Sequence, residues 1–255
     1  MARIIQTEPL TRQSFAPFGD VIENPLPTLH PFTASTSSSP LPFDGISANQ
    51  GSAIKYQHVS RQLNLYPQSP SGVPANSVMN IFVCAARVSI PSPSGPSTNP
   101  TTFNIRVLER HPYTTQTFIP QSNPLHPGKA KNYLVIVAPT LPPLPIDKKD
   151  FPVPEKLDSA EYPRPLPGAG MPDLSKLRAF VASSPQQAVT YGAGTWHAPM
   201  VTLGEKGEML DFLVVQFANG VGIEDCQEVY YEGEQDEKVV AKVDALPDIV
   251  GSAKL

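Results

Sequence analysis

Proline is the residue that most constrains the fold of this chain. The sequence has 31 prolines among 255 residues, about twice the usual share of roughly 5 %. Because proline breaks helix interiors and interrupts the hydrogen-bond ladder of a central strand, this content favours short strands joined by long loops over a helical bundle. Ten of the prolines lie in residues 139–172. We expect a Pro-rich insertion there, which either lies idle on the surface or forms a flap near a site.

Apolar segments of strand length recur between the loops. Residues 103–109 alternate apolar and polar side chains, as in a half-buried strand, and residues 133–139 form a continuous apolar run, as in a buried one. Thr11 is expected to cap a short helix. Further strands are expected at residues 78–90, 115–120, 177–181, 187–191, 211–217 and 227–231. The sequence therefore predicts a single all-β domain over residues 1–255, a barrel or sandwich with minor helices and Pro-rich loop insertions.

Charge and hydropathy exclude several classes of partner. The net charge is −4 and the sequence has no block of lysine and arginine, so neither nucleic acid nor a membrane is an expected partner. The sequence also lacks an N-terminal signal segment and an apolar run of about 18 residues, which predicts a cytoplasmic protein. The C-terminal Ala253-Lys254-Leu255 is related to the Ser-Lys-Leu peroxisomal signal and keeps that compartment open. Residues 232–255 are expected to form a poorly ordered tail.

Two segments carry side chains typical of an active site. Glu109 and His111 are two residues apart at a strand end, so their side chains point to the same face. Gln116 follows after a turn, where the next strand can return it to that face. In the second segment, a glycine-containing turn at residues 192–194 delivers His197 at the start of a strand. The pattern predicts a pocket built around His111 and His197.

These segments resemble the two sequence motifs of the cupin family. In the first motif, Glu109 replaces the first histidine, His111 matches the second, and Gln116 stands where a carboxylate is usual. The second motif is matched by residues 192–197, with glycine in place of proline. The resemblance implies a double-stranded β-helix barrel. Glu109, His111, Gln116 and His197 could ligate a divalent cation, or the same side chains could act without a metal as acids, bases and hydrogen-bond donors. Both interpretations stay open.

A closer resemblance covers roughly residues 10–230. The segments LERHPYTTQTFIP, YLVIVAP, PDLSKLRAFV and YGAGTWHAP, in this order, are similar to the ureidoglycolate lyase family. The Pro-rich insertions look longer than in bacterial members, which indicates a fungal-type version. The resemblance implies a homodimer that eliminates urea from (S)-ureidoglycolate and leaves glyoxylate, a step of allantoin degradation in purine metabolism. It implies no required cofactor, although some members are described as stimulated by nickel.

The resemblance also directs the expected roles of the site residues. His111 and Glu109 are expected to form the acid/base pair, and the carboxylate on the same face is expected to raise the pKa of His111. His197 would orient the substrate or act as the second proton-transfer group. Lys55 or Arg110 could bind the substrate carboxylate, but Arg110 alternates to the face opposite His111, which favours Lys55. The expected hydrogen-bond partners of the substrate are Tyr56, Asn49 and Gln116.

Two other classes of function stay open at the level of sequence. A non-catalytic cupin would bind a small carboxylic acid in the same pocket without needing an acid/base pair. A metal-dependent cupin dioxygenase or isomerase would hold iron or manganese, and the glutamate and glutamine in the first motif weigh against it.

Overall fold

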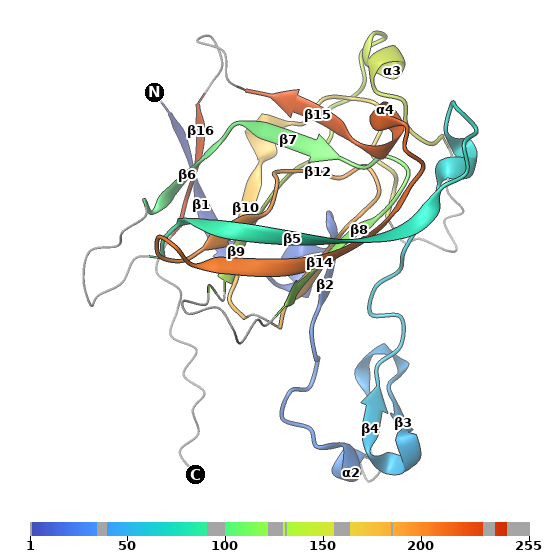
Figure 1. Cartoon of the computed structure of the whole chain (residues 1–255), viewed down its shortest axis with the longest axis vertical. Helices are drawn as coiled ribbons and strands as arrows, with labels where there is room; N and C mark the ends of the chain where they lie inside the picture. Colours follow the sequence, from blue (N-terminus) through green and yellow to red (C-terminus); the bar gives the residue numbers. More distant parts are fainter. Residues whose placement is uncertain are drawn as a thin grey trace.

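The computed structural model describes residues 2–34, 40–90, 100–121, 130, 132–155, 164–184, 186–231 and 238–243 (Figure 1). Short strands dominate this part of the chain, and its α-helices have four residues each. The helices are α1 (Arg12–Phe15), α2 (Pro31–Ala34), α3 (Asp147–Asp150) and α4 (Gly222–Asp225). None of the helices in these ranges is long and apolar enough to cross a membrane. The prediction of an all-β fold with minor helices is confirmed.

The strands form one large sheet that curls into a barrel, together with one separate hairpin. The strands are β1 (Arg3–Pro9), β2 (Gly19–Ile22), β3 (Ile46–Ala48), β4 (Ala53–Lys55), β5 (Asn76–Val88), β6 (Thr102–Ile105), β7 (Val107–Arg110), β8 (Gln116–Gln121), β9 (Asn132–Ala138), β10 (Arg178–Ala182), β11 (Ala188–Tyr191), β12 (Trp196–His197), β13 (Val201–Leu203), β14 (Met209–Ala218), β15 (Gln227–Tyr230) and β16 (Val239–Lys242). One wall of the barrel has the order β2-β11-β8-β14-β5, and β12 joins β9 to β7 in the other.

Alternation along the strands divides the apolar residues between two clusters. One contains Tyr133, Phe180 and Phe212, and the other contains Leu108 and Trp196. Successive residues of β9 enter the two clusters in turn, because neighbouring side chains of a strand point to opposite faces. The same rule decides which residues of β7 and β12 can meet.

The expected strands are present, with informative differences. The run at residues 103–109 is split at Arg106 into β6 and β7, so its two halves pair with different neighbours. The strand expected to start at His197 is the two-residue β12, and β13 was not predicted, because three residues are too short to show a period. Residues 238–243 of the predicted tail are ordered, since β16 pairs with β1 and β6. The peroxisome-like residues 253–255 lie outside the described residues.

The Pro-rich insertion packs on the outside of the barrel wherever it is described. Its two ends are joined, because Leu141 and Met171 share a backbone hydrogen bond of 2.8 Å. The carbonyl of Gly170 accepts a hydrogen bond from the indole of Trp196 at 3.2 Å. Residues 164–172 are therefore fixed against the face of β12 that carries Trp196, the face opposite His197.

A second excursion, the arm (residues 40–57), extends away from the barrel (Figure 1). Its strands β3 and β4 pair only with each other among the described strands, and α2 packs against β4. The arm is closed at its base by a backbone hydrogen bond from Gln57 to Phe43. The chain rejoins the barrel at Ser60, whose hydroxyl lies 2.9 Å from a carboxylate oxygen of Asp20.

Candidate active site

Three of the predicted residues come together on one face of β7 and β12. His197 and Glu109 are directly opposed in the pairing of these strands, and His197 Nε2 lies 3.5 Å from Glu109 Oε1. The ring centroids of His111 and His197 are 5.6 Å apart. One ligand atom from each of the three side chains lies within 4.8 Å of the others. We call Glu109, His111 and His197 the cluster.

The turn before β12 joins the two sequence motifs. Gly194 has a φ of +75°, a conformation that residues with a side chain rarely adopt. In this conformation its N–H donates to the carbonyl of His111 at 2.9 Å. The glycine of the second motif thus fixes the backbone of the histidine in the first.

Backbone carbonyls orient both imidazoles. His111 Nδ1 lies 2.6 Å from the carbonyl of Asp225, and His197 Nδ1 lies 2.9 Å from that of Thr195. A carbonyl only accepts, so each Nδ1 carries a hydrogen and each ring turns its Nε2 into the cluster. Both Nε2 atoms are buried and lack a hydrogen-bond partner within the described ranges. Buried polar atoms are rarely left in this state, which marks the cluster as the place where a ligand binds.

The electrostatics of His111 differ from the sequence prediction. Burial lowers its pKa to about 4, the neighbouring His197 adds to this effect, and the opposing attraction of Glu109 is smaller. The prediction of a raised pKa was therefore wrong, because a charged imidazole loses more hydration in this site than Glu109 returns. His111 is neutral at pH 7.

The electrostatics of Glu109 favour the charged form. Burial opposes the carboxylate, but His197 and His111 outweigh it, so the pKa of Glu109 is lowered. The cluster therefore combines an ionised carboxylate with the unprotonated Nε2 of His111.

Tyr191 and Gln116 extend the cluster. The Tyr191 ring stacks on His197, with centroids 3.9 Å apart and planes inclined by 12°. Gln116 is directly opposed to Tyr191 across β8 and β11, so both side chains lie on the same face. Its amide donates to Gln216 at 2.7 Å, while its buried Oε1 is left without a described partner. We did not predict a role for Tyr191, although its position directly before the glycine turn could have indicated one.

Arg110 lies on the opposite face of β7 and has other partners. Its guanidinium donates to Gln227 Oε1 at 2.8 Å and to the carbonyl of Gly168 at 2.9 Å, and it stacks on Trp196 at 4.3 Å. The side chain is completely buried. The structure therefore uses Arg110 to hold the Pro-rich insertion and does not bring it to the cluster.

The remaining predicted residues lie on the arm. Lys55 ends β4 and is exposed, Tyr56 follows it, and Asn49 begins the turn between β3 and β4. In Figure 1 these strands are far from β7 and β12. Within one chain, the structure does not bring Lys55, Tyr56 or Asn49 to the cluster.

The cluster has the composition and geometry of a divalent-cation site. Two imidazoles and one carboxylate suit Ni²⁺, Zn²⁺ or Fe²⁺, and carbonyls behind each Nδ1 are the usual support for ligating histidines. A second group, Glu109, Cys226 and Glu228, is equally close. Burial first, and then Glu109 and Glu228, raise the pKa of Cys226 to about 12, so this thiol is protonated at pH 7.

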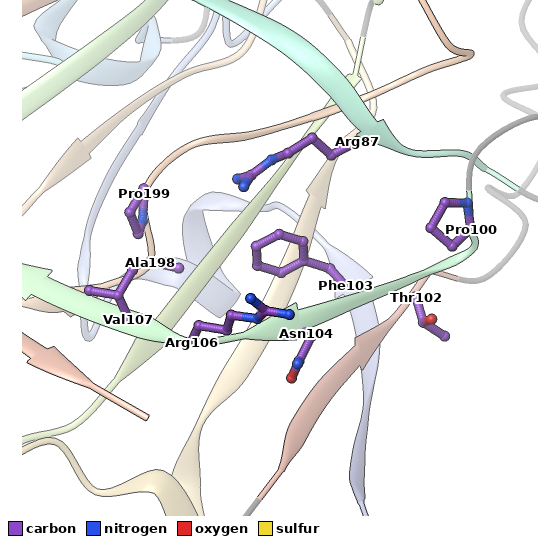
Figure 2. Close-up of a pocket in the computed structure, with 9 residues that line it drawn as sticks. All are labelled: Arg87, Pro100, Thr102, Phe103, Asn104, Arg106, Val107, Ala198 and Pro199. Carbon is purple, nitrogen blue, oxygen red and sulfur yellow. The ribbon is translucent and has the colours of Figure 1, made fainter. Parts of the chain in front are cut away.

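A separate pocket of about 480 Å³ lies beside the cluster (Figure 2). Arg87 and Arg106 lie around the ring of Phe103, and the Arg87 guanidinium is 4.9 Å from its centroid. Val107 of β7 and Pro199, two residues after His197, complete the wall near the cluster. Two arginine side chains therefore line this pocket.

The comparisons with known proteins show the family of this chain. A model of the family described as ureidoglycolate lyase matches residues 2–237. The chain belongs to the ureidoglycolate lyase family. Similar proteins include the ureidoglycolate lyases of Schizosaccharomyces pombe, 34 % identical over 89 % of this chain and 91 % of the relative, and of Saccharomyces cerevisiae, 32 % identical over 89 % and 94 %. The ureidoglycolate lyase of Pseudomonas aeruginosa strain LESB58 is 31 % identical over 91 % and 94 %. The family predicted from the sequence is confirmed.

Proposed function

We propose that this chain is a carbon–nitrogen lyase that eliminates urea from (S)-ureidoglycolate and leaves glyoxylate, a step in the degradation of allantoin and purines. The observation that carries the proposal is the meeting of Glu109, His111 and His197, the first and last of them directly opposed across β7 and β12, with unpartnered histidine Nε2 atoms, in a member of this family. We also propose that the protein acts in the cytoplasm as a homodimer.

The reaction moves one proton from oxygen to nitrogen. The substrate hydroxyl gives up its proton, its oxygen forms the carbonyl of glyoxylate, and the C–N bond breaks. The electron pair of that bond goes to the urea nitrogen, which takes up a proton. No oxidant, reductant or water is consumed, so the protein has only to bind the anion and to move the proton.

The cluster is arranged for this transfer. Glu109, held in its charged form, accepts the hydroxyl proton, and His197 Nε2 at 3.5 Å passes it to the leaving nitrogen. Neutral His111 accepts a hydrogen bond from the substrate at Nε2, since its Nδ1 is bound to the carbonyl of Asp225. The unpartnered Oε1 of Gln116 accepts from an N–H of the urea group.

A divalent cation, when bound, would be held by Glu109, His111 and His197 and would act as a Lewis acid toward the substrate oxygens. The residues themselves still position the substrate and exclude water. Nickel is expected to raise the Tm of the purified protein and to leave that of His197→Ala unchanged, because binding to the folded state alone stabilises it. An equal rise in both proteins would place the metal elsewhere.

The test is to supply purified protein with (S)-ureidoglycolate and to follow urea and glyoxylate with and without a chelator. The two products are expected in equal amounts. No urea release under either condition would refute the lyase, and glyoxylate binding without turnover would point to a carboxylate-binding module. His197→Ala is expected to lower kcat by about 10²–10⁴-fold, the range for a positioned acid or base, and unchanged turnover would remove His197 from the mechanism.

A further inference from the structure

The imidazole of His111 is held by a carbonyl that belongs to a very short helix. Its Nδ1 lies 2.6 Å from the carbonyl oxygen of Asp225, which is the last residue of the four-residue α4. A helix of about one turn is not stable through its own hydrogen bonds. The direction of the His111 ring therefore depends on the groups that fix α4 to the rest of the molecule.

The side chain of Asp225 is one of these groups. Its Oδ1 accepts a hydrogen bond from the N–H of Asn219 at 2.9 Å, and its Oδ2 accepts from the N–H of Gly220 at 2.8 Å. The third donor is the hydroxyl of Tyr66, which lies 2.6 Å from Oδ1. Hydrogen bonds to a carboxylate are among the stronger ones in proteins. The three donors therefore fix Asp225, and with it the carbonyl that His111 contacts.

Glu224, the neighbour of Asp225 in α4, provides a second attachment. It is 2 % exposed, and its carboxylate accepts from both the N–H and the hydroxyl of Ser71, at 2.8 and 2.7 Å. It also accepts from the side-chain amide of Asn219 at 2.7 Å. Since Tyr66 and Ser71 belong to the same loop before β5, α4 is bonded to this loop at two places.

The same loop also contacts the segment that carries His111. The N–H of Leu65 donates to the carbonyl of Tyr113 at 2.8 Å, and the rings of Tyr66 and Tyr113 have centroids 5.7 Å apart. Both tyrosines are completely buried, and Tyr113 follows His111 by two residues. Residues 65 and 66 are therefore bonded to the segments on both sides of the hydrogen bond between His111 and Asp225.

We propose that Tyr66 is a positioning residue for His111 and acts through the carboxylate of Asp225. The Tyr66 hydroxyl contacts this carboxylate and the carbonyl of Phe217, so it acts on the substrate only by fixing the direction of His111 Nε2. Groups that support a functional histidine in this way tune both its orientation and its basicity. The inference rests on the proposed function, in which His111 Nε2 accepts a hydrogen bond from ureidoglycolate.

Tyr66→Phe tests this role with the smallest change of shape, because it removes the hydroxyl and keeps the ring against Tyr113. The KM for (S)-ureidoglycolate is expected to rise by about 10-fold, the lower end of the effect of removing such support. The kcat is expected to change little, since His111 binds the substrate without transferring a proton. Steady-state release of urea measures both. A merely structural loss would lower the fraction of active protein, and so the apparent kcat, at an unchanged KM, and that outcome would refute the proposal.

The hydrogen on His111 Nδ1 provides a measurement that needs no turnover. It exchanges with water only when its bond to the Asp225 carbonyl opens, and nuclear magnetic resonance of ¹⁵N-labelled, chelator-treated protein follows the exchange. The sequence has five histidines, and the signal of His111 is identified by its loss in His111→Asn. Tyr66→Phe is expected to speed the exchange by about 10-fold, as for the loss of one supporting hydrogen bond.

Exchange at the wild-type rate in Tyr66→Phe would overturn the proposal. Wild-type protein that releases no urea would refute the proposed reaction alone, because the exchange of the Nδ1 hydrogen would still decide whether Tyr66 positions His111.

Tyr133→Phe is the matched control. The Tyr133 hydroxyl is also buried and donates to a backbone carbonyl, that of Gln187, at 2.6 Å, but this bond does not hold α4. The Tm is expected to fall by similar amounts in Tyr66→Phe and Tyr133→Phe. The KM and the exchange of the His111 hydrogen are expected to change in Tyr66→Phe alone. Equal changes in both variants would assign the effect to a general loss of stability and would contradict a positioning role.

A double variant tests whether Tyr66 acts through Asp225. Asp225→Asn keeps the size of the side chain and weakens its contacts with the three donors, so its KM is expected to rise by about 100-fold, the upper end of the range. Adding Tyr66→Phe to Asp225→Asn is then expected to raise KM no further, because the two residues act in one chain of contacts. Fold-changes that multiply would show that Tyr66 acts by another route. Near-ultraviolet circular dichroism checks folding, and if Tyr66→Phe is unfolded, the KM and exchange of Asp225→Asn decide.

Discussion

The cluster and the arm carry residues of the same predicted site but are built in contrasting ways. Each histidine of the cluster is buried, and a backbone carbonyl fixes its ring. Lys55 on the arm is exposed, in a hairpin that pairs only with itself among the described strands. Burial of a rigidly held group shifts its pKa, whereas a charged group on a projecting hairpin is free to contact a ligand. The contrast teaches that residues predicted for one site can lie on segments that the fold keeps apart.

The largest expected effect is on kcat and comes from a substitution in the cluster. It is compared with a substitution in the arm, which is predicted to affect binding. Glu109→Gln keeps the size of the side chain but removes the charge, so kcat is expected to fall by about 10²–10⁴-fold. Under the sequence prediction that Lys55 binds the substrate carboxylate, Lys55→Ala is expected to act mainly through KM. Steady-state release of urea measures both. Glu205→Gln, in the exposed turn after β13, is the control for a lost carboxylate. Equal changes in KM for Glu109→Gln and Lys55→Ala would contradict the expected difference between an effect on kcat and an effect on KM.

A smaller effect concerns pH and is confined to the cluster. The folded pKa of His111 is about 4 and its unfolded pKa about 6.5, so between these values the unfolded chain binds more protons. The free energy of unfolding therefore falls as pH drops from about 6.5 to about 4, by roughly 3 kcal/mol in total from this residue.

Thermal melting of chelator-treated protein across this range measures the loss. His111→Asn is expected to have a shallower dependence on pH, whereas Lys55→Ala is expected to follow the wild type. If His111→Asn retained the wild-type dependence of Tm on pH, the burial of His111 would not be the source of that dependence.

The smallest expected effect compares two glycines with left-handed backbone. Gly194→Ala is expected to cost about 1–2 kcal/mol of stability and to lower kcat, because the Gly194 N–H holds the carbonyl of His111. Gly51, in the arm, has a φ of +91° and no atom within 4 Å of an added Cβ. Gly51→Ala is expected to leave the Tm of the barrel unchanged, because the arm pairs only with itself among the described strands. Calorimetry with kinetics measures both, and a large drop in Tm for Gly51→Ala would mean that the arm and barrel unfold together.

Much of the barrel was predictable because its signals are local. The apolar run at residues 133–139 and the expected strand at 211–217 correspond to β9 and β14. The Thr11 cap was also predicted, since a single side chain accepts from the N–H of Ser14. The two-residue strand β12 gave no periodic signal, although it aligns His197 with Glu109.

The candidate site was only partly predictable. The residues of the cluster follow from two short motifs. The alternation of side chains also predicts that Arg110 points to the face of β7 opposite the cluster. The sign of the pKa shift of His111 did not follow, because it depends on desolvation by strands distant in sequence. The ring of Tyr191 on His197 depends likewise on the pairing of β11 with β8.

The sequence by itself determined the β architecture and the same-face placement of Glu109 and His111. It also determined the glycine turn that presents His197. These depend on alternation and backbone freedom, which act over a few residues. The tertiary structure decided the protonation of the cluster, the attachment of Arg110 to the insertion and the position of Lys55 away from its own barrel. Those depend on burial and on which segments pack together, and no local pattern encodes either.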